Sequence, residues 1–177
     1  MNKAAFLDRD GTINIDKNYL YKIEDFEFIP GAIETMRKLK ELGYLLVIIT
    51  NQSGIARGYY TEEDFYTLTE WMKEVLLNKG ISIDGVYYCP HLPDAEMKKY
   101  KVECNCRKPK TGLFYKAAME LNIDIDNSIA IGDKMRDLAI CDETMCRGFL
   151  IDKIGDEIKD NSSIERVDSI VSIIDVI

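Results

Sequence analysis

Residues 4–12, AAFLDRDGT, run from a short apolar segment directly into two aspartates. The apolar residues 4–7 predict a strand of the core, because a short apolar run bounded by a turn signal is typical of one. Asp8 and Asp10 follow where that strand ends, and Gly11 permits a sharp exit of the chain. One carboxylate could bind a hard cation and attack phosphorus, while the other protonates a leaving oxygen and later activates water. A solvated acidic turn is the alternative interpretation of these residues, since Asp-Gly often marks a turn.

The rest of the chain alternates strand-like apolar runs with segments of helical periodicity. Further strands are predicted at residues 45–50, 86–88, 129–132 and 148–151, with a last edge strand at 169–171. Helices are predicted at residues 31–42, 62–78, 111–121 and 134–142, the second with Thr61 as its N-cap and Gly80 just past its end. This order predicts an α/β fold: a three-layer sandwich with a central parallel sheet, as a single domain over residues 1–177 without a large cap domain.

Polar residues stand directly after three of these strands. Asp8, Thr50 and Asp133 each follow an apolar run. Ligands of parallel α/β sheets bind beyond the carboxyl ends of the strands. We therefore expect a carboxylate, a hydroxyl and a second carboxylate to meet at one edge of the sheet.

Two further motifs could bind phosphate. In residues 50–54, TNQSG, the Thr50 hydroxyl and neighbouring backbone N–H groups could hold phosphoryl oxygens. In residues 106–110, CRKPK, Lys108 could neutralise a transferring phosphoryl group and Arg107 could hold a second anion. Taken alone, the first motif favours a plain turn after a strand over a functional site, and a solvated basic surface is the alternative for the second.

The last motif, residues 130–137, is AIGDKMRD. Asp133 suits Mg²⁺, since that cation prefers carboxylate and water oxygens. Asp137 lies one helical turn further on and could orient Lys134 or a metal-bound water. An acid exposed at a helix N-terminus, where it favours the helix dipole, is the alternative for Asp137.

The only histidine and three of the five cysteines crowd into residues 89–106. Cys89 and His91 form a Cys-x-His pair, and Cys104 and Cys106 form a Cys-x-Cys pair twelve residues later. Two close pairs joined by a short excursion predict a structural Zn²⁺ with a closed Cys₃His shell. Such a zinc would hold the charged loop and fix Arg107 and Lys108 after the last ligand, whereas two buried cysteine pairs that bind nothing are the alternative.

Cys141 and Cys146 stand outside that pattern. A locally repacked helix explains them, and a second metal or redox role is the alternative.

The formal charge of −8 argues against a nucleic-acid groove and against binding to an anionic membrane. The longest apolar run, residues 44–49, is too short to span a bilayer, and no signal-peptide pattern opens the chain. We therefore expect a cytoplasmic protein, and its compact form without an obvious extra cap domain favours a monomer. A site for an anionic substrate must then gain its positive charge locally, from a metal ion and nearby Lys or Arg.

Taken together, the motifs LDRDGTIN, TNQSGIARG, CPH, CNCRKPK and IGDK, with LTEWM at 68–72, resemble those of the haloacid dehalogenase-like phosphatases from about residue 4 to 137. The resemblance implies their Rossmann-like fold and the following roles. Asp8 is the nucleophile and a Mg²⁺ ligand, and Asp10 is the general acid/base whose backbone carbonyl joins the Mg²⁺ shell. Thr50 and Lys108 stabilise the phosphoryl group, and Asp133 completes the Mg²⁺ ligands. The implied substrate contacts are Asp16, Lys17, Asn18, Tyr19, Thr50, Asn51, Gln52, Ser53, Arg107, Lys108 and Lys134.

The resemblance also implies a reaction: hydrolysis of the 7-phosphate of a heptose 1,7-bisphosphate through an aspartyl-phosphate. That step serves the synthesis of ADP- or GDP-heptose for lipopolysaccharide and other cell-surface glycans. Two phosphates would explain the surplus cations, with Arg107 or Arg57 holding the second one. A histidinol-phosphate phosphatase is the nearest alternative, although such relatives carry Asp where Ser53 stands and have a shorter zinc loop. A zinc-stabilised binding protein with vestigial catalytic motifs is the alternative from another class.

Overall fold

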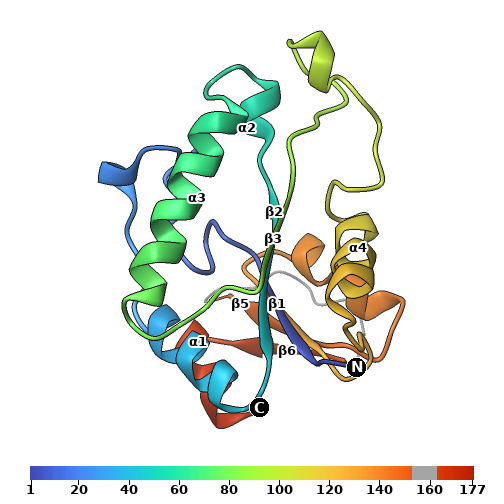
Figure 1. The fold of residues 1–177 in the computed structure, drawn as a ribbon. Coiled ribbons are helices and arrows are strands. Elements are labelled where there is room, and N and C mark those ends of the chain that lie inside the picture. The colour runs from blue at the N-terminus through green and yellow to red at the C-terminus, as the bar shows by residue number, and fades with distance from the viewer. Residues whose placement is uncertain (153–162) are drawn as a thin grey trace.

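A computed structural model describes residues 1–152 and 163–177, which form a six-stranded parallel sheet in the order β3-β2-β1-β4-β5-β6 (Figure 1). The strands are β1 (Ala4–Leu7), β2 (Leu45–Asn51), β3 (Gly85–Cys89), β4 (Ile129–Gly132), β5 (Arg147–Ile151) and β6 (Ile164–Val167). The α-helices are α1 (Ala32–Glu41), α2 (Ser53–Ala56), α3 (Glu62–Leu77) and α4 (Gly112–Leu121). Short 3₁₀ helices are η1 (Ile23–Asp25), η2 (Lys98–Tyr100), η3 (Met135–Asp142) and η4 (Ile170–Asp175).

Helices cover both faces of the sheet, so the central strands are buried on each side. In β1, Phe6 packs into the core on the α4 and η3 face, while Leu7 packs on the opposite face against α1 and α3. Val47 and Ile48 of β2 divide between the faces in the same way. Successive side chains of a strand point to opposite faces, which explains why these strands are continuous apolar runs. The predicted three-layer architecture with a parallel sheet is confirmed.

Most of the predicted elements are confirmed within a residue or two. The N-cap of α3 is Thr61, whose side chain accepts from the backbone N–H of Asp64 in a capping box. Gly80 follows α3 with a φ of +78°. The predicted helix at 134–142 is a 3₁₀ helix, η3, rather than an α-helix.

The prediction of an edge strand at 169–171 was wrong. The edge strand β6 comes earlier, at Ile164–Val167, and pairs with β5. Ser169 instead precedes η4, in which Ile170 and Ile173 are both fully buried and pack in the core that includes α1. Apolar residues three apart share one face of a 3₁₀ helix, so their spacing carried the correct signal.

The carboxyl ends of β1, β2, β3 and β4 share one edge of the sheet, where the loops that follow them gather. The chain between β3 and α4 extends away from the sheet beside α2 (Figure 1). Among the described residues, no helix has the length and apolar character needed to cross a membrane.

Candidate active site

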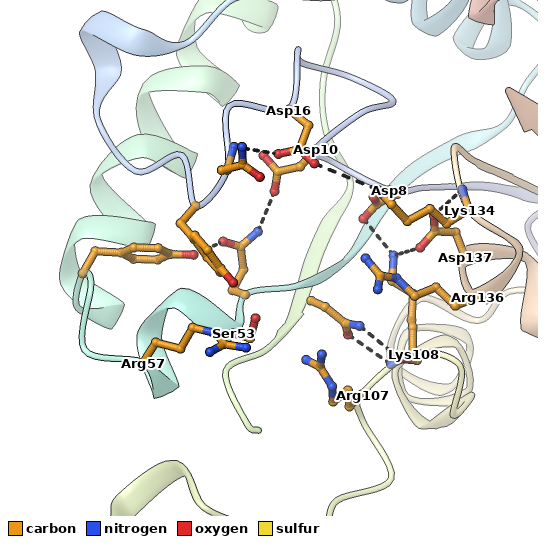
Figure 2. A pocket seen from close by; sticks show the side chains of 15 residues that line it. Asp8, Asp10, Asp16, Ser53, Arg57, Arg107, Lys108, Lys134, Arg136 and Asp137 are labelled. Carbon is orange, nitrogen blue, oxygen red and sulfur yellow. Dashed lines mark hydrogen bonds and ion pairs between the residues drawn. The ribbon is translucent and has the colours of Figure 1, made fainter. Parts of the chain in front are cut away.

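A polar cavity of about 300 Å³ opens at this edge of the sheet. Its lining comes from the loops after β1, β2 and β4 and from the chain between β3 and α4 (Figure 2). The lining residues are Asp8, Asp10, Asp16, Asn18, Tyr19, Asn51, Gln52, Ser53, Arg57, Tyr60, Arg107, Lys108, Lys134, Arg136 and Asp137. The structure thus brings most of the predicted site residues to one place.

Lys108 and two carboxylates form a buried ion cluster in this cavity. Its Nζ lies 2.8 Å from Oδ1 of Asp8 and 2.8 Å from Oδ1 of Asp137, and it donates to the carbonyl of Ile49 at 2.6 Å. Burial raises the pKa of Asp8 to about 7; Asp137 adds to this and Lys108 opposes it. Burial disfavours the charged form of Lys108, but Asp8 and Asp137 outweigh it and raise the pKa of that amine. Lys108 therefore stays cationic beside the predicted nucleophile.

Three carboxylates of the site could hold a divalent cation. Asp8, Asp133 and Asp137 each offer an oxygen, and these oxygens lie within 4.8 Å of one another. Oδ1 of Asp133 is buried without a hydrogen-bond partner among the described residues, so one acceptor remains for a ligand. Gly11 has a φ of +88°, and a Cβ there would collide with the Asp133 carboxylate. A cluster of carboxylate oxygens fits Mg²⁺.

The carboxylate of Asp10 does not join that cluster. It pairs with Arg9 at 3.0 Å and accepts from the side-chain amides of Asn14 and Gln52, each at 3.0 Å. A metal role for Asp10 therefore stays with its backbone carbonyl, as the resemblance implied, and remains a prediction.

Two predicted substrate contacts do not line the cavity. Thr50 lies inside β2 rather than after it, because the strand continues to Asn51, which pairs with Cys89. The Thr50 side chain is buried, and its hydroxyl accepts from Nε2 of Gln52 at 2.9 Å. Lys17 forms an exposed ion pair with Glu27 at 3.4 Å. The roles of both residues remain predictions.

Cations gather at the other end of the cavity. In Figure 2, Arg57, Arg107 and Ser53 lie away from Asp8 and Asp137. Arg57 pairs with no carboxylate among the described residues, and its guanidinium lies 5.7 Å from the ring centroid of Tyr19. Arg107 donates to the carbonyl of His91 at 3.3 Å. The two arginines are thus available to a ligand anion.

The predicted zinc ligands come together in the chain between β3 and α4. Cys106 Sγ lies 3.1 Å from the sulfurs of both Cys89 and Cys104 and 3.3 Å from Nδ1 of His91. Ligands of a tetrahedral Zn²⁺ with Zn–S of about 2.3 Å stand about 3.8 Å apart, so this cluster needs only a small expansion to hold one. Burial favours the Cys104 thiol, but hydrogen bonds from Cys106 and Cys89 lower the pKa of Cys104 to about 6. The four residues fit zinc.

A second set of contacts holds this segment against the start of α3. The carboxylate of Glu62 accepts from the hydroxyls of Tyr88 and Tyr100, each at 2.7 Å, and from Lys99 at 3.2 Å. Hydrogen bonds from Tyr88 and Tyr100 lower the pKa of Glu62. The zinc ligands are therefore not the only residues that hold this segment, because Glu62 also ties it to α3.

The remaining cysteines are buried in the core beside η3 and β5. The hydrogen bond with Cys141, together with burial, raises the pKa of the Cys146 thiol. Neither belongs to a group of described residues that could hold a metal. The locally repacked helix remains a prediction.

Several residues of the site were missed from the sequence. Arg9 and Tyr60 are buried around Asp10, and Arg136 lines the cavity. The pairing of Asp137 with Lys108 was also missed, although Asp137 does accept from the backbone N–H of Lys134 at 3.1 Å. No local sequence pattern marks these contacts. Each one joins side chains that are distant in sequence or that belong to no recognisable motif.

Comparisons with known proteins agree with the geometry of the site. The family model described as polynucleotide kinase 3 phosphatase matches residues 3–145. D-glycero-beta-D-manno-heptose-1,7-bisphosphate 7-phosphatase from Photorhabdus laumondii is 56% identical over 135 residues, covering 76% of this chain and 72% of the relative. The protein of the same name from Haemophilus influenzae is 54% identical over 138 residues, covering 78% and 74%.

A solved structure shares the whole fold. The D,D-heptose 1,7-bisphosphate phosphatase from B. bronchiseptica, crystallised with magnesium and phosphate, has a TM-score of 0.81 at 26% identity and covers 98% of this chain and 97% of that one. The resemblance found in the motifs is therefore confirmed. This protein belongs to the haloacid dehalogenase-like phosphatases, in the same family as the heptose-1,7-bisphosphate 7-phosphatases.

Proposed function

We propose that this protein is a Mg²⁺-dependent phosphatase that hydrolyses the 7-phosphate of D-glycero-D-manno-heptose 1,7-bisphosphate. The observation that carries the proposal is the division of one cavity into two ends. Asp8, Lys108 and Asp137 occupy one end. Arg57 and Arg107 occupy the other, and neither guanidinium pairs with a carboxylate among the described residues. Such a cavity suits a molecule with two phosphates, and relatives more than half identical are named for that substrate.

The reaction has two displacements on phosphorus. A carboxylate oxygen of Asp8 attacks the 7-phosphate, and the bond from phosphorus to the sugar oxygen breaks as Asp10 gives that oxygen a proton. Asp10 then takes a proton from water, whose oxygen attacks the aspartyl-phosphate, so that inorganic phosphate leaves and the Asp8 carboxylate is restored. Lys108 stabilises the charge of the phosphoryl group in both steps.

A divalent cation would be held by Asp8 and Asp133, with Asp137 beside them. When bound, Mg²⁺ supplies charge neutralisation at the phosphoryl oxygens. We propose that the backbone carbonyl of Asp10 would also contact the cation and that Thr50 would stabilise the phosphoryl group. The four zinc ligands would have a structural role, because a closed shell leaves no position for substrate.

The second phosphate needs its own cations. We place the 1-phosphate against Arg57 and Arg107, with Ser53 as a hydrogen-bond donor at the same end. Lys134 pairs with Asp133 at 2.9 Å, at the end of the cavity that holds Asp8. We therefore propose that Lys134 contacts the 7-phosphate rather than the 1-phosphate. We propose that Asn18, Tyr19 and Asp16 contact the sugar between them, because all three line the cavity.

The setting of the enzyme follows from its chemistry. A Cys₃His site requires reduced thiols, which the cytoplasm maintains. We therefore propose that the enzyme is cytoplasmic. We also propose that it acts as a monomer and folds as a single domain, with residues 89–106 as its zinc loop. Its product would feed the synthesis of nucleotide-activated heptose for cell-surface glycans.

Phosphate release from four substrates tests the proposal: the α and β anomers of the heptose bisphosphate, histidinol phosphate and a 3′-phosphorylated oligonucleotide. The expected result is fastest turnover of one bisphosphate anomer, with the 1-phosphate retained in the product. The chain carries a net charge of −8, so the polyanionic oligonucleotide should be the poorest substrate. Faster turnover of histidinol phosphate or of the oligonucleotide would contradict the proposed substrate.

A further inference from the structure

Three side chains hold the carboxylate of Asp10 in one orientation. Arg9 donates from Nε and Nη2 at 3.0 to 3.3 Å, Asn14 donates to Oδ1 at 3.0 Å, and Gln52 donates to Oδ2 at 3.0 Å. Asp10 itself is only partly buried, whereas Arg9 is 2% exposed. A proton donor must lie within hydrogen-bond reach of the leaving oxygen, so the groups that fix its carboxylate affect its chemistry.

The Gln52 amide is oriented in turn by Tyr60. The Tyr60 hydroxyl donates to Oε1 of Gln52 at 2.5 Å, while Nε2 of Gln52 donates to Asp10 and to the hydroxyl of Thr50. An amide presents an acceptor at one end and donors at the other. A donor at Oε1 therefore directs the N–H groups toward Asp10.

Tyr60 is well placed to set that orientation because it is held on two sides. Its ring stacks on the ring of Tyr21 with centroids 5.2 Å apart, and a Cβ at Gly54 would collide with it. Tyr60 is 6% exposed. The hydroxyl can therefore move little relative to Gln52.

Arg9 connects the same network to the loop after β1. Its Nη2 donates to the carbonyl of Leu20 at 3.0 Å and to Oε1 of Gln52 at 3.4 Å. Leu20 directly follows Tyr19, which lines the cavity. One guanidinium thus spans the proposed acid and the loop that meets the substrate.

We infer that Tyr60 and Arg9 are positioning residues for the proposed acid/base Asp10: they hold its carboxylate at the leaving oxygen, Tyr60 through Gln52 and Arg9 directly. The inference rests on the proposed function, in which Asp10 protonates the leaving sugar oxygen. It assigns a role in the reaction to two buried residues that the proposed function does not use.

The test compares two leaving groups in Tyr60→Phe, which removes one hydroxyl and keeps the stacked ring. A sugar alkoxide needs a proton in order to leave, whereas p-nitrophenolate is a stable anion and does not. The ratio kcat/KM reports on steps up to departure of the leaving group. The sugar substrate is the heptose bisphosphate, or whichever alkyl phosphate the wild type hydrolyses fastest.

We expect Tyr60→Phe to lower kcat/KM for the alkyl phosphate by about tenfold or more, a fraction of what a general acid contributes, and to leave kcat/KM for p-nitrophenyl phosphate within about twofold. Asp10→Asn should show the same selectivity with a larger loss. Tyr21→Phe is the matched control, because no described residue hydrogen-bonds its hydroxyl, and it should behave as the wild type. Arg9→Lys keeps the charge but loses the fork that reaches both Asp10 and Leu20, so it should repeat the Tyr60→Phe pattern.

Equal losses for both leaving groups in Tyr60→Phe, or no loss for either, would overturn the inference. So would a rise in the inhibition constant of the dephosphorylated sugar product that matches the loss, because Tyr60 would then act by touching substrate. Failure of the proposed function has a different signature: Asp8→Asn would keep its activity. Loss of activity in Asp8→Asn with unselective losses in Tyr60→Phe would leave the function standing and remove only the positioning role.

Discussion

The Nζ of Lys108 lies 2.8 Å from Oδ1 of Asp8, although the two residues are 100 positions apart in the chain. Both side chains are buried at the end of the cavity where the proposed reaction takes place. The same ammonium group lies 2.8 Å from Asp137, so one cation separates two carboxylates. Its removal would leave two acids facing each other without compensation.

Lys108→Met should therefore reduce both activity and stability. Loss of one partner from a buried ion cluster costs about 3–5 kcal/mol, which should appear as a lower denaturant midpoint. Phosphate release should fall by on the order of 10²-fold or more, as for the loss of other preorganised charges at a reacting group. Lys110→Met removes an exposed lysine from the same motif and should change neither quantity. A normal midpoint in Lys108→Met would contradict the ion cluster.

Arg57→Met should weaken binding of the bisphosphate and spare a monophosphate. A hydrogen bond to a charged group contributes about 1.5–3 kcal/mol, so KM for the heptose bisphosphate should rise by about 10- to 100-fold. KM for p-nitrophenyl phosphate, which has no second phosphate, is the internal control and should not change. Equal effects on the two substrates would place Arg57 outside the second phosphate site.

The purified protein should contain about one zinc ion per chain, measured by elemental analysis. Cys104→Ser should lose it and unfold at lower denaturant, since a structural zinc contributes directly to folding. Cys146→Ala is the control: it alters a buried cysteine outside the cluster and should retain zinc. Full zinc occupancy in Cys104→Ser would show that this set of ligands is wrong.

Glu62→Gln should lose stability at neutral pH but not in acid. Hydrogen bonds from Tyr88 and Tyr100 lower the pKa of Glu62 in the folded state, so its stabilising contribution is present above the unfolded pKa of about 4.3 and disappears as the pH falls through the folded value. The difference in denaturant midpoint between wild type and Glu62→Gln should therefore shrink below about pH 4. Glu63→Gln removes a neighbouring exposed charge from the same helix turn and controls for the helix dipole. A difference that persists in acid would contradict this pH dependence.

The fold could be predicted because its central strands are buried on both faces. Burial on two sides demands continuous apolar runs such as residues 4–7 and 45–49, and Asp8 marks the point where β1 ends. The zinc cluster was equally visible, since its ligands occur as two close pairs around the only histidine. Both signals are local in sequence.

No local sequence signal predicted the side-chain contacts between different loops of the site. The sequence placed Asp137 near Lys134 on its own helix turn, whereas the partner of its other oxygen is Lys108, from the chain before α4. Thr50 was expected at the end of its strand, but β2 continues past it, and its hydroxyl accepts from Nε2 of Gln52. Such pairings depend on how the loops pack over the sheet edge, which spacing alone does not determine.

The most direct test of the account is to trap the phosphoryl group on Asp8. In Asp10→Asn, p-nitrophenyl phosphate can transfer its phosphoryl group without a proton donor, but no base remains to activate water. A burst of one nitrophenol per enzyme should appear, and peptide mass spectrometry of the acid-quenched protein should find one added phosphoryl group on the peptide that contains Asp8. A burst with the phosphoryl group on another residue, or steady turnover with no covalent adduct, would contradict Asp8 as the nucleophile.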